Sequence, residues 1–82
     1  MREMKYVMVE SEEYGEQLFI FPTNIDHDKF AEVLHDIGSY EESAYREPVG
    51  AGFTNLKECY GESGTLGIGN RKKDTRALRG EL

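Results

Sequence analysis

The 82-residue sequence has no tryptophan, a single cysteine, two prolines and no long apolar run. The single cysteine, Cys59, excludes an internal disulfide. No stretch approaches the roughly 20 apolar residues that span a bilayer, and none resembles a secretory signal. We therefore expect no membrane contact and a reduced, cytoplasmic setting.

The length limits the chain to one domain with one modest hydrophobic core. Charged residues make up 32% of the sequence and hydrophobic residues 38%. This composition is polar, but five tyrosines and four phenylalanines can build a core. We therefore expect a globular rather than a disordered protein.

Positive charges are outnumbered by negative ones and are unevenly placed, and the net charge is −6. Residues 1–62 contain 14 Asp or Glu and 5 Lys or Arg, whereas residues 63–82 contain 2 and 5. An acidic chain is a poor general binder of nucleic acid, so that partner is not favoured. The basic C-terminal part could still contact an anion or the acidic body of a neighbouring copy.

Residues 4–10 and 17–22 are rich in β-branched and aromatic side chains and predict two strands joined by an acidic hairpin loop. In the second strand both faces are apolar. One face carries Leu18 and Ile20, and the other carries Phe19 and Phe21. Such a strand is either central in a sheet or lies at a homodimer contact.

The spacing of apolar residues predicts a helix over 27–37. They recur at i, i+3, i+4 and i+7, at Phe30, Val33, Leu34 and Ile37. Asp26 is the expected N-cap, with Ile25 and Phe30 as a hydrophobic staple across it. Gly38 is expected to end the helix.

In the C-terminal half, the sequence predicts an acidic loop over 39–47, then a strand over 48–55 and a partner strand at 58–61. A turn-rich stretch follows over 62–69. A short helix is expected over 71–79, with Asn70 as its N-cap. Gly50 and Gly52 share one face of the strand, where they would let a backbone or a ligand approach closely or would mark a bulge. The predicted fold class is α+β. About four mainly antiparallel strands pack on one central helix (27–37) in the order ββαββα.

Three patches in this half, "AGFTN", "CYGESGTLGI" and "NRKKDTRAL", follow a pattern of AGF, CYG-x-S, [ST]LG and an Arg-x-x-Asp helix start. In this the chain resembles a family of small uncharacterised bacteriophage and prophage proteins over roughly residues 50–79. The resemblance implies a phage or prophage origin and a compact α+β fold, and it implies no activity. The chain departs from the pattern at Lys72 and Lys73, where a proline and an acid are expected.

The stretch "GTLGIGNRKK" is a candidate anion-binding loop because a glycine-rich turn leads into a basic helix start. Its candidate residues are Gly67, Gly69, Asn70, Arg71, Lys72 and Lys73. Cations in the first turn of a helix work against its dipole, and a bound phosphate would reverse that effect. The alternative is that Gly64, Gly67 and Gly69 provide turns with positive φ. The spacing matches neither a Walker A loop nor a dinucleotide fingerprint, and we favour the turn.

A second candidate site is an acidic surface for a protein partner. Its candidate residues are Glu10, Glu12, Glu13, Glu16, Glu41 and Glu42, with Glu47 beside them. The alternative is ordinary solvation. Acidic surfaces of this kind can also mimic the phosphates of a nucleic acid.

Catalytic and metal-binding patterns are weak. His27 and His35 are eight residues apart, too far for a shared helical metal site, and we expect both to be solvated. Cys59 is expected to be a small core residue. We therefore expect no enzyme, no metal and no cofactor. The favoured function is a phage or prophage accessory protein that binds a host or phage protein through its acidic surface. The alternative is a phosphate, nucleotide or nucleic-acid binding module that uses residues 64–73.

Overall fold

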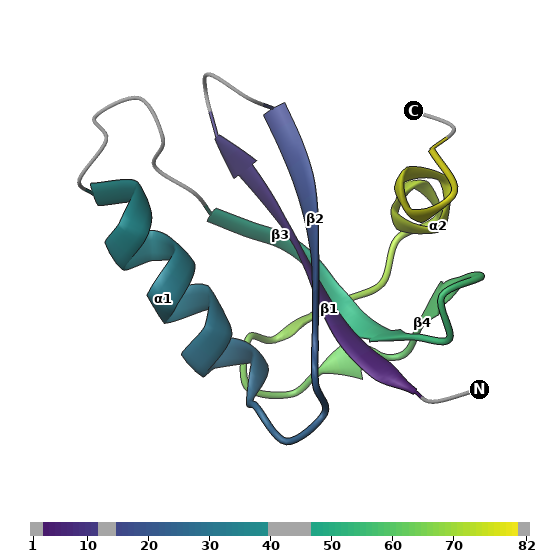
Figure 1. Cartoon of the computed structure of the whole chain (residues 1–82), viewed down its shortest axis with the longest axis horizontal. Coiled ribbons are helices and arrows are strands. Elements are labelled where there is room, and N and C mark those ends of the chain that lie inside the picture. The colour runs from purple at the N-terminus through teal and green to yellow at the C-terminus, as the bar shows by residue number, and fades with distance from the viewer. Residues whose placement is uncertain (1–2, 12–14, 40–46, 81–82) are drawn as a thin grey trace.

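The computed structural model describes residues 3–11, 15–39 and 47–80. The elements are, in chain order, β1 (Met4–Ser11), β2 (Gly15–Phe21), α1 (His27–Ser39), β3 (Glu47–Thr54), β4 (Cys59–Tyr60), β5 (Glu62–Ser63), β6 (Ile68–Gly69) and α2 (Lys72–Leu78). The fold class is α+β, as predicted. A curled sheet lies between α1 and α2, so each helix covers one face (Figure 1). None of the described helices is long and apolar enough to cross a membrane.

The main sheet has four antiparallel strands in the order β2-β1-β3-β4. The predicted number of strands is therefore right for this sheet. The stretch 62–69 forms an additional small hairpin, in which β5 pairs with β6 on either side of a turn. Two-residue strands around a glycine-rich turn leave too short a pattern for sequence analysis to detect.

The centre of the sheet is β1, which pairs with β2 on one side and with β3 on the other. Its four residues 6–9 are at most 1% exposed, so both of its faces are buried. The prediction that strand 17–22 could be central is wrong, because β2 lies at the edge of the sheet. Its two apolar faces are explained by the two helices, which flank the edge strand as well as the centre.

Two apolar clusters hold the layers together. On the α1 face, the buried residues are Val7, Val9, Phe21, Leu34 and Ala51, with Phe19, Ile25, Phe30, Leu66 and Ile68 packed against them. On the α2 face, the buried residues are Tyr6, Met8 and Cys59, with Leu18, Val49, Ala77 and Leu78 against them. Cys59 is therefore a core residue, as predicted.

Helix α1 begins where the sequence predicts, and the carbonyl oxygen of Asp26 accepts the N–H of Phe30 at 3.1 Å. The ring of Phe30 stacks on Phe21 with centroids 4.2 Å apart. Two details differ from the prediction. The helix runs on to Ser39, so Gly38 does not end it, and Val33 is 53% exposed rather than in the core. Phe30 and Leu34 belong to the apolar cluster that joins α1 to the sheet.

The prediction of a solvated His27 is wrong. Its residue is 4% exposed, and its Nε2 lies 2.7 Å from the carbonyl oxygen of Gly52. Because a carbonyl can only accept, Nε2 carries the proton and donates it. Phe21 and Phe53 meet the imidazole edge-on, with centroids at 5.5 and 5.7 Å. Position 27 is the first of the helix and faces the sheet, whereas His35 is exposed, as expected.

Candidate functional site

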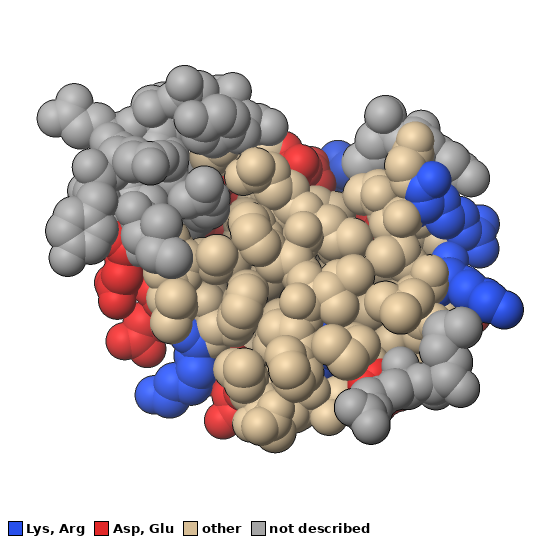
Figure 2. All heavy atoms as spheres, viewed as in Figure 1, with Lys and Arg blue, Asp and Glu red and all other residues tan. Residues whose placement is uncertain are grey.

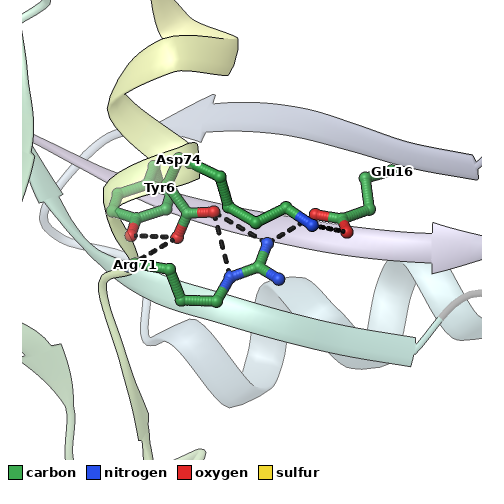
Figure 3. A network of polar contacts seen from close by, with 5 residues as sticks. Tyr6, Glu16, Arg71 and Asp74 are labelled. Carbon is green, nitrogen blue, oxygen red and sulfur yellow. Dashed lines mark hydrogen bonds and ion pairs between the residues drawn. The ribbon is translucent and has the colours of Figure 1, made fainter. Parts of the chain in front are cut away.

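A network of polar side chains joins the start of α2 to the sheet, on the face opposite α1 (Figure 3). Tyr6 and Asp74 are both 0% exposed, and the Tyr6 hydroxyl donates to Asp74 Oδ2 at 2.7 Å. The two residues are 68 positions apart in the chain. A buried carboxylate is tolerated only when its oxygens are bonded, so this contact and those below make Asp74 acceptable in the core.

Arg71 bridges Asp74 to the edge strand. Its Nε and Nη2 donate to Asp74 Oδ1 at 3.1 and 2.8 Å, and its Nη2 also donates to Glu16 Oε1 on β2. The second oxygen of Glu16 accepts from Lys73 Nζ at 2.7 Å. The result is a chain of alternating charges from the core to the surface, in which Glu16 has a side-chain exposure of only 16%.

The pKa values of Glu16, Tyr6 and Cys59 are shifted further from neutral pH. The hydrogen bonds from Arg71 and then Lys73 hold the pKa of Glu16 below its ordinary value. Burial, and next the bond to Asp74, raise the pKa of Tyr6 far above its ordinary value. Burial and the nearby Asp74 charge raise the pKa of Cys59 to about 11. The thiol is therefore protonated at neutral pH and is a poor nucleophile.

The start of α2 differs from the prediction, because the N-cap is Arg71 and not Asn70. The N–H of Arg71 donates to Asp74 Oδ2 at 3.1 Å, and the N–H of Asp74 returns a bond to the Arg71 carbonyl at 2.9 Å. An acid three residues after the N-cap thus satisfies the helix start and complements its dipole. The side-chain Nδ2 of Asn70 instead donates to the carbonyl oxygen of Cys59 at 3.5 Å.

The glycine-rich part of the candidate anion loop is a turn between β5 and β6. Gly67 has φ +68° and its N–H donates to the Ser63 carbonyl at 2.9 Å. Ser63 Oγ accepts the N–H of Leu66 at 3.2 Å, which closes the turn. Of the three glycines expected to supply positive φ, Gly67 alone does so, and Gly64 and Gly69 do not.

The donors expected to hold an anion already have partners within the chain. The N–H of Asn70 donates to the Gly61 carbonyl, and that of Arg71 to Asp74. The side chains of Arg71 and Lys73 are paired with Glu16. An added phosphate would have to compete with these carboxylates. Lys72 is exposed and has no ion pair with a described residue. The expected conflict between Arg71 and the helix dipole is relieved by Asp74.

The acidic candidates divide into three groups. Glu12, Glu13, Glu41 and Glu42 lie outside the described residues. Glu16 is largely covered by Arg71 and Lys73, so it is not an open contact for a partner. Glu10 is exposed, and it sits between Glu16 on β2 and Glu47 on β3 in the strand register. We call Glu10, Glu16 and Glu47 the acidic row. It crosses three adjacent strands at the end of the sheet beside the start of α2.

Sequence reasoning missed Tyr6 and Asp74 as members of a site. The spacing of Arg71 and Asp74 is the one local signal that could have indicated them, because it matches a capping box. The glycine face of β3 was interpreted correctly as a place of close approach. A Cβ on Gly52 would lie 2.4 Å from the carbonyl oxygen of Tyr60, so the approaching group there is the backbone of β4.

Among the described residues, no three or more His, Cys, Asp or Glu side chains are grouped so that they could hold a metal ion. Comparison of the chain with protein-family models, with curated proteins and with solved structures finds no match. The resemblance to phage and prophage proteins therefore stays a prediction. The site itself is the basis for a functional proposal.

Proposed function

We propose that this chain is a non-enzymatic, cytoplasmic protein-binding module that presents Glu10 and Glu47, the exposed members of the acidic row, to a basic surface of a partner. The observation that carries the proposal is the strand register, which sets Glu10 directly beside both Glu16 and Glu47. Like charges opposite each other on neighbouring strands destabilise a sheet. Such a row is unfavourable for folding alone, and a cationic partner would relieve it.

The row is neutralised at one end and open at the other. Arg71 and Lys73 compensate Glu16, whereas Glu10 and Glu47 are exposed and have no ion pair with a described residue. The net charge of −6 adds a long-range field of the same sign. A partner that presents Lys or Arg would be attracted to this end of the sheet. The resemblance makes a host or phage protein the expected partner, in a phage or prophage accessory role.

The test is affinity capture from a host lysate with three forms of the protein. The first is the natural chain. The second carries Glu10→Lys and Glu47→Lys. The third is a control with the same change of charge, Glu58→Lys and Glu62→Lys, at two exposed positions outside the row. All three are first checked for the same circular dichroism and melting temperature.

We expect a specific protein to bind the natural chain and the control but not the variant of the row. We also expect its affinity to fall as salt is added, because exposed charges are screened within about 10 Å at 0.1 M salt. A partner that binds all three forms equally would remove the acidic row as the contact. Recovery of no partner would count against the module as a whole.

A further inference from the structure

Strand β2 lies at one edge of the main sheet. Among the described strands, β2 has β1 on one side and none on the other. In Figure 1 it passes in front of β1 and β3, with α1 to one side and α2 to the other. Its outward N–H and C=O groups therefore form a template for another extended chain.

This edge lacks the features that usually prevent such pairing. Edge strands are commonly interrupted by charged side chains, proline or a bulge. Residues 17–21, "QLFIF", contain no charge and no proline, and their pairing with β1 is regular throughout. Ile20 is 37% exposed although it lies opposite the buried Tyr6. The edge is therefore both uninterrupted and apolar.

The surface around the edge is also mainly uncharged at its centre (Figure 2). Figure 2 shows the molecule from the side of β2, and the centre of this face is mainly uncharged. Lys, Arg, Asp and Glu side chains lie around its periphery. An uncharged centre with a charged rim is the usual anatomy of a protein interface.

We propose that the edge of β2 pairs with the β2 edge of a second copy of this chain, in an antiparallel, two-fold arrangement. Residues 17–21 carry no charge, so two copies of this segment can lie side by side without a like-charge pair. When the pairing is centred on Phe19, Leu18 lies opposite Ile20 of the second copy. Cross-strand partners share a face, and both residues belong to the α2 face, so the exposed Ile20 gains an apolar neighbour. Pro22, which has no N–H, and Glu16 end the paired segment.

The side chains of Phe19 and Phe21 give no reason for a second copy. Phe21 is 2% exposed and Phe19 packs on the α1 cluster, with its ring 6.3 Å from that of Phe30. Both are covered within one chain and need no second copy. The reasons for a second copy are the position of β2 at the sheet edge and the exposure of Ile20. The paired segment ends at Glu16, which Arg71 and Lys73 already cover, so Glu10 and Glu47 lie outside it and the pairing does not depend on the proposed function.

Sedimentation of the natural chain over a concentration series tests the pairing. The segment is short, so we expect weak association, with a dissociation constant between about 1 µM and 1 mM. The mass should rise from the 9.4 kDa of one chain towards twice that value. Because each copy carries −6, added salt should strengthen the dimer. Binding through the acidic row has the opposite salt dependence.

Two variants locate the contact. Ile20→Lys puts a charge opposite Leu18 of the second copy and should keep the chain monomeric at every concentration, with its fold retained. Leu56→Lys is the matched control, because Leu56 is 52% exposed and lies in the turn between β3 and β4. This control should dimerise like the natural chain.

Hydrogen exchange on the natural chain gives an independent readout. Those amides of residues 17–21 that point away from β1 should gain protection as the concentration rises, more than those of β3. A single 9.4-kDa species at about 1 mM would overturn the proposal. So would a dimer that survives Ile20→Lys, or a dimer whose concentration-dependent protection lies outside residues 17–21.

Discussion

The carboxylate of Asp74 lies where a side chain at Gly50 would be, on the α2 face of the sheet. A Cβ on Gly50 would lie 2.3 Å from Asp74 Oδ2, the oxygen that accepts from Tyr6. A hydrogen in place of a side chain at position 50 is therefore what allows the carboxylate to reach the core. Gly50 on β3 makes room for Asp74 on α2, and the hydrogen bond from Tyr6 to Asp74 then holds α2 on the sheet.

Gly50→Ala should destabilise the protein by about 1–3 kcal/mol. The added methyl must displace a carboxylate that Tyr6 and Arg71 hold in place, and overpacking of a dense core costs about this much. Chemical denaturation measures the change in the free energy of unfolding. The control is Gly64→Ala, where a Cβ would meet nothing within 4 Å. The control should be neutral or slightly stabilising, and equal losses in the two variants would contradict the role of Gly50.

Tyr6→Phe should cost about 1–2 kcal/mol, because it removes one hydrogen bond from a buried carboxylate and changes little of the packing. Tyr60→Phe is the matched control. The Tyr60 hydroxyl donates to Glu3 at 2.6 Å, but that bond is exposed to solvent. Its loss should cost less than about 0.5 kcal/mol. If the two variants unfold at the same denaturant concentration, the buried bond contributes no more than the exposed one.

Acid should remove the contribution of Glu16. The pKa of Glu16 is lowered in the folded state, so the stabilisation is present above the ordinary pKa of 4.5 that the group has in the unfolded chain. It is lost as pH falls below 4.5 through the folded pKa, because protonation breaks the pairs with Arg71 and Lys73. We compare the unfolding free energies of the natural chain and Glu16→Gln from neutral pH down to about pH 3. The natural chain should be more stable at neutral pH, and the difference should shrink on acidification. A constant difference would mean that the charge of Glu16 does not matter.

Phosphate should not stabilise the protein more than chloride does at matched ionic strength. The donors at 70, 71 and 73 are already bonded within the chain, so residues 64–73 offer an anion few unpaired groups. Lys72→Glu should raise stability by about 0.3–1 kcal/mol, because an exposed acid in the first helical turn complements the dipole. Thermal melts give both results. A true site would instead add about 2.7 kcal/mol at 100 times its dissociation constant, and Lys72→Glu would weaken that response.

Local sequence patterns were sufficient for the main elements of the fold. The spacing of Phe30 and Leu34 indicated α1. The β-branched and aromatic residues of β1 and β2, and the alternation along β3, indicated the strands of the sheet. These signals lie within one element and follow from the geometry of helices and strands. The fold class could therefore be predicted, as could the close approach at the glycine face of β3.

The roles of single side chains were decided by contacts between distant segments. Both histidines lie on α1, yet His27 is buried against the backbone of β3 and His35 is exposed. Glu16 looked like part of an acidic surface, and Arg71 looked like part of an anion site. They neutralise each other across 55 positions of the chain. Only the tertiary structure brings such groups within a few ångströms, and charge neutralisation depends on that distance rather than on sequence spacing.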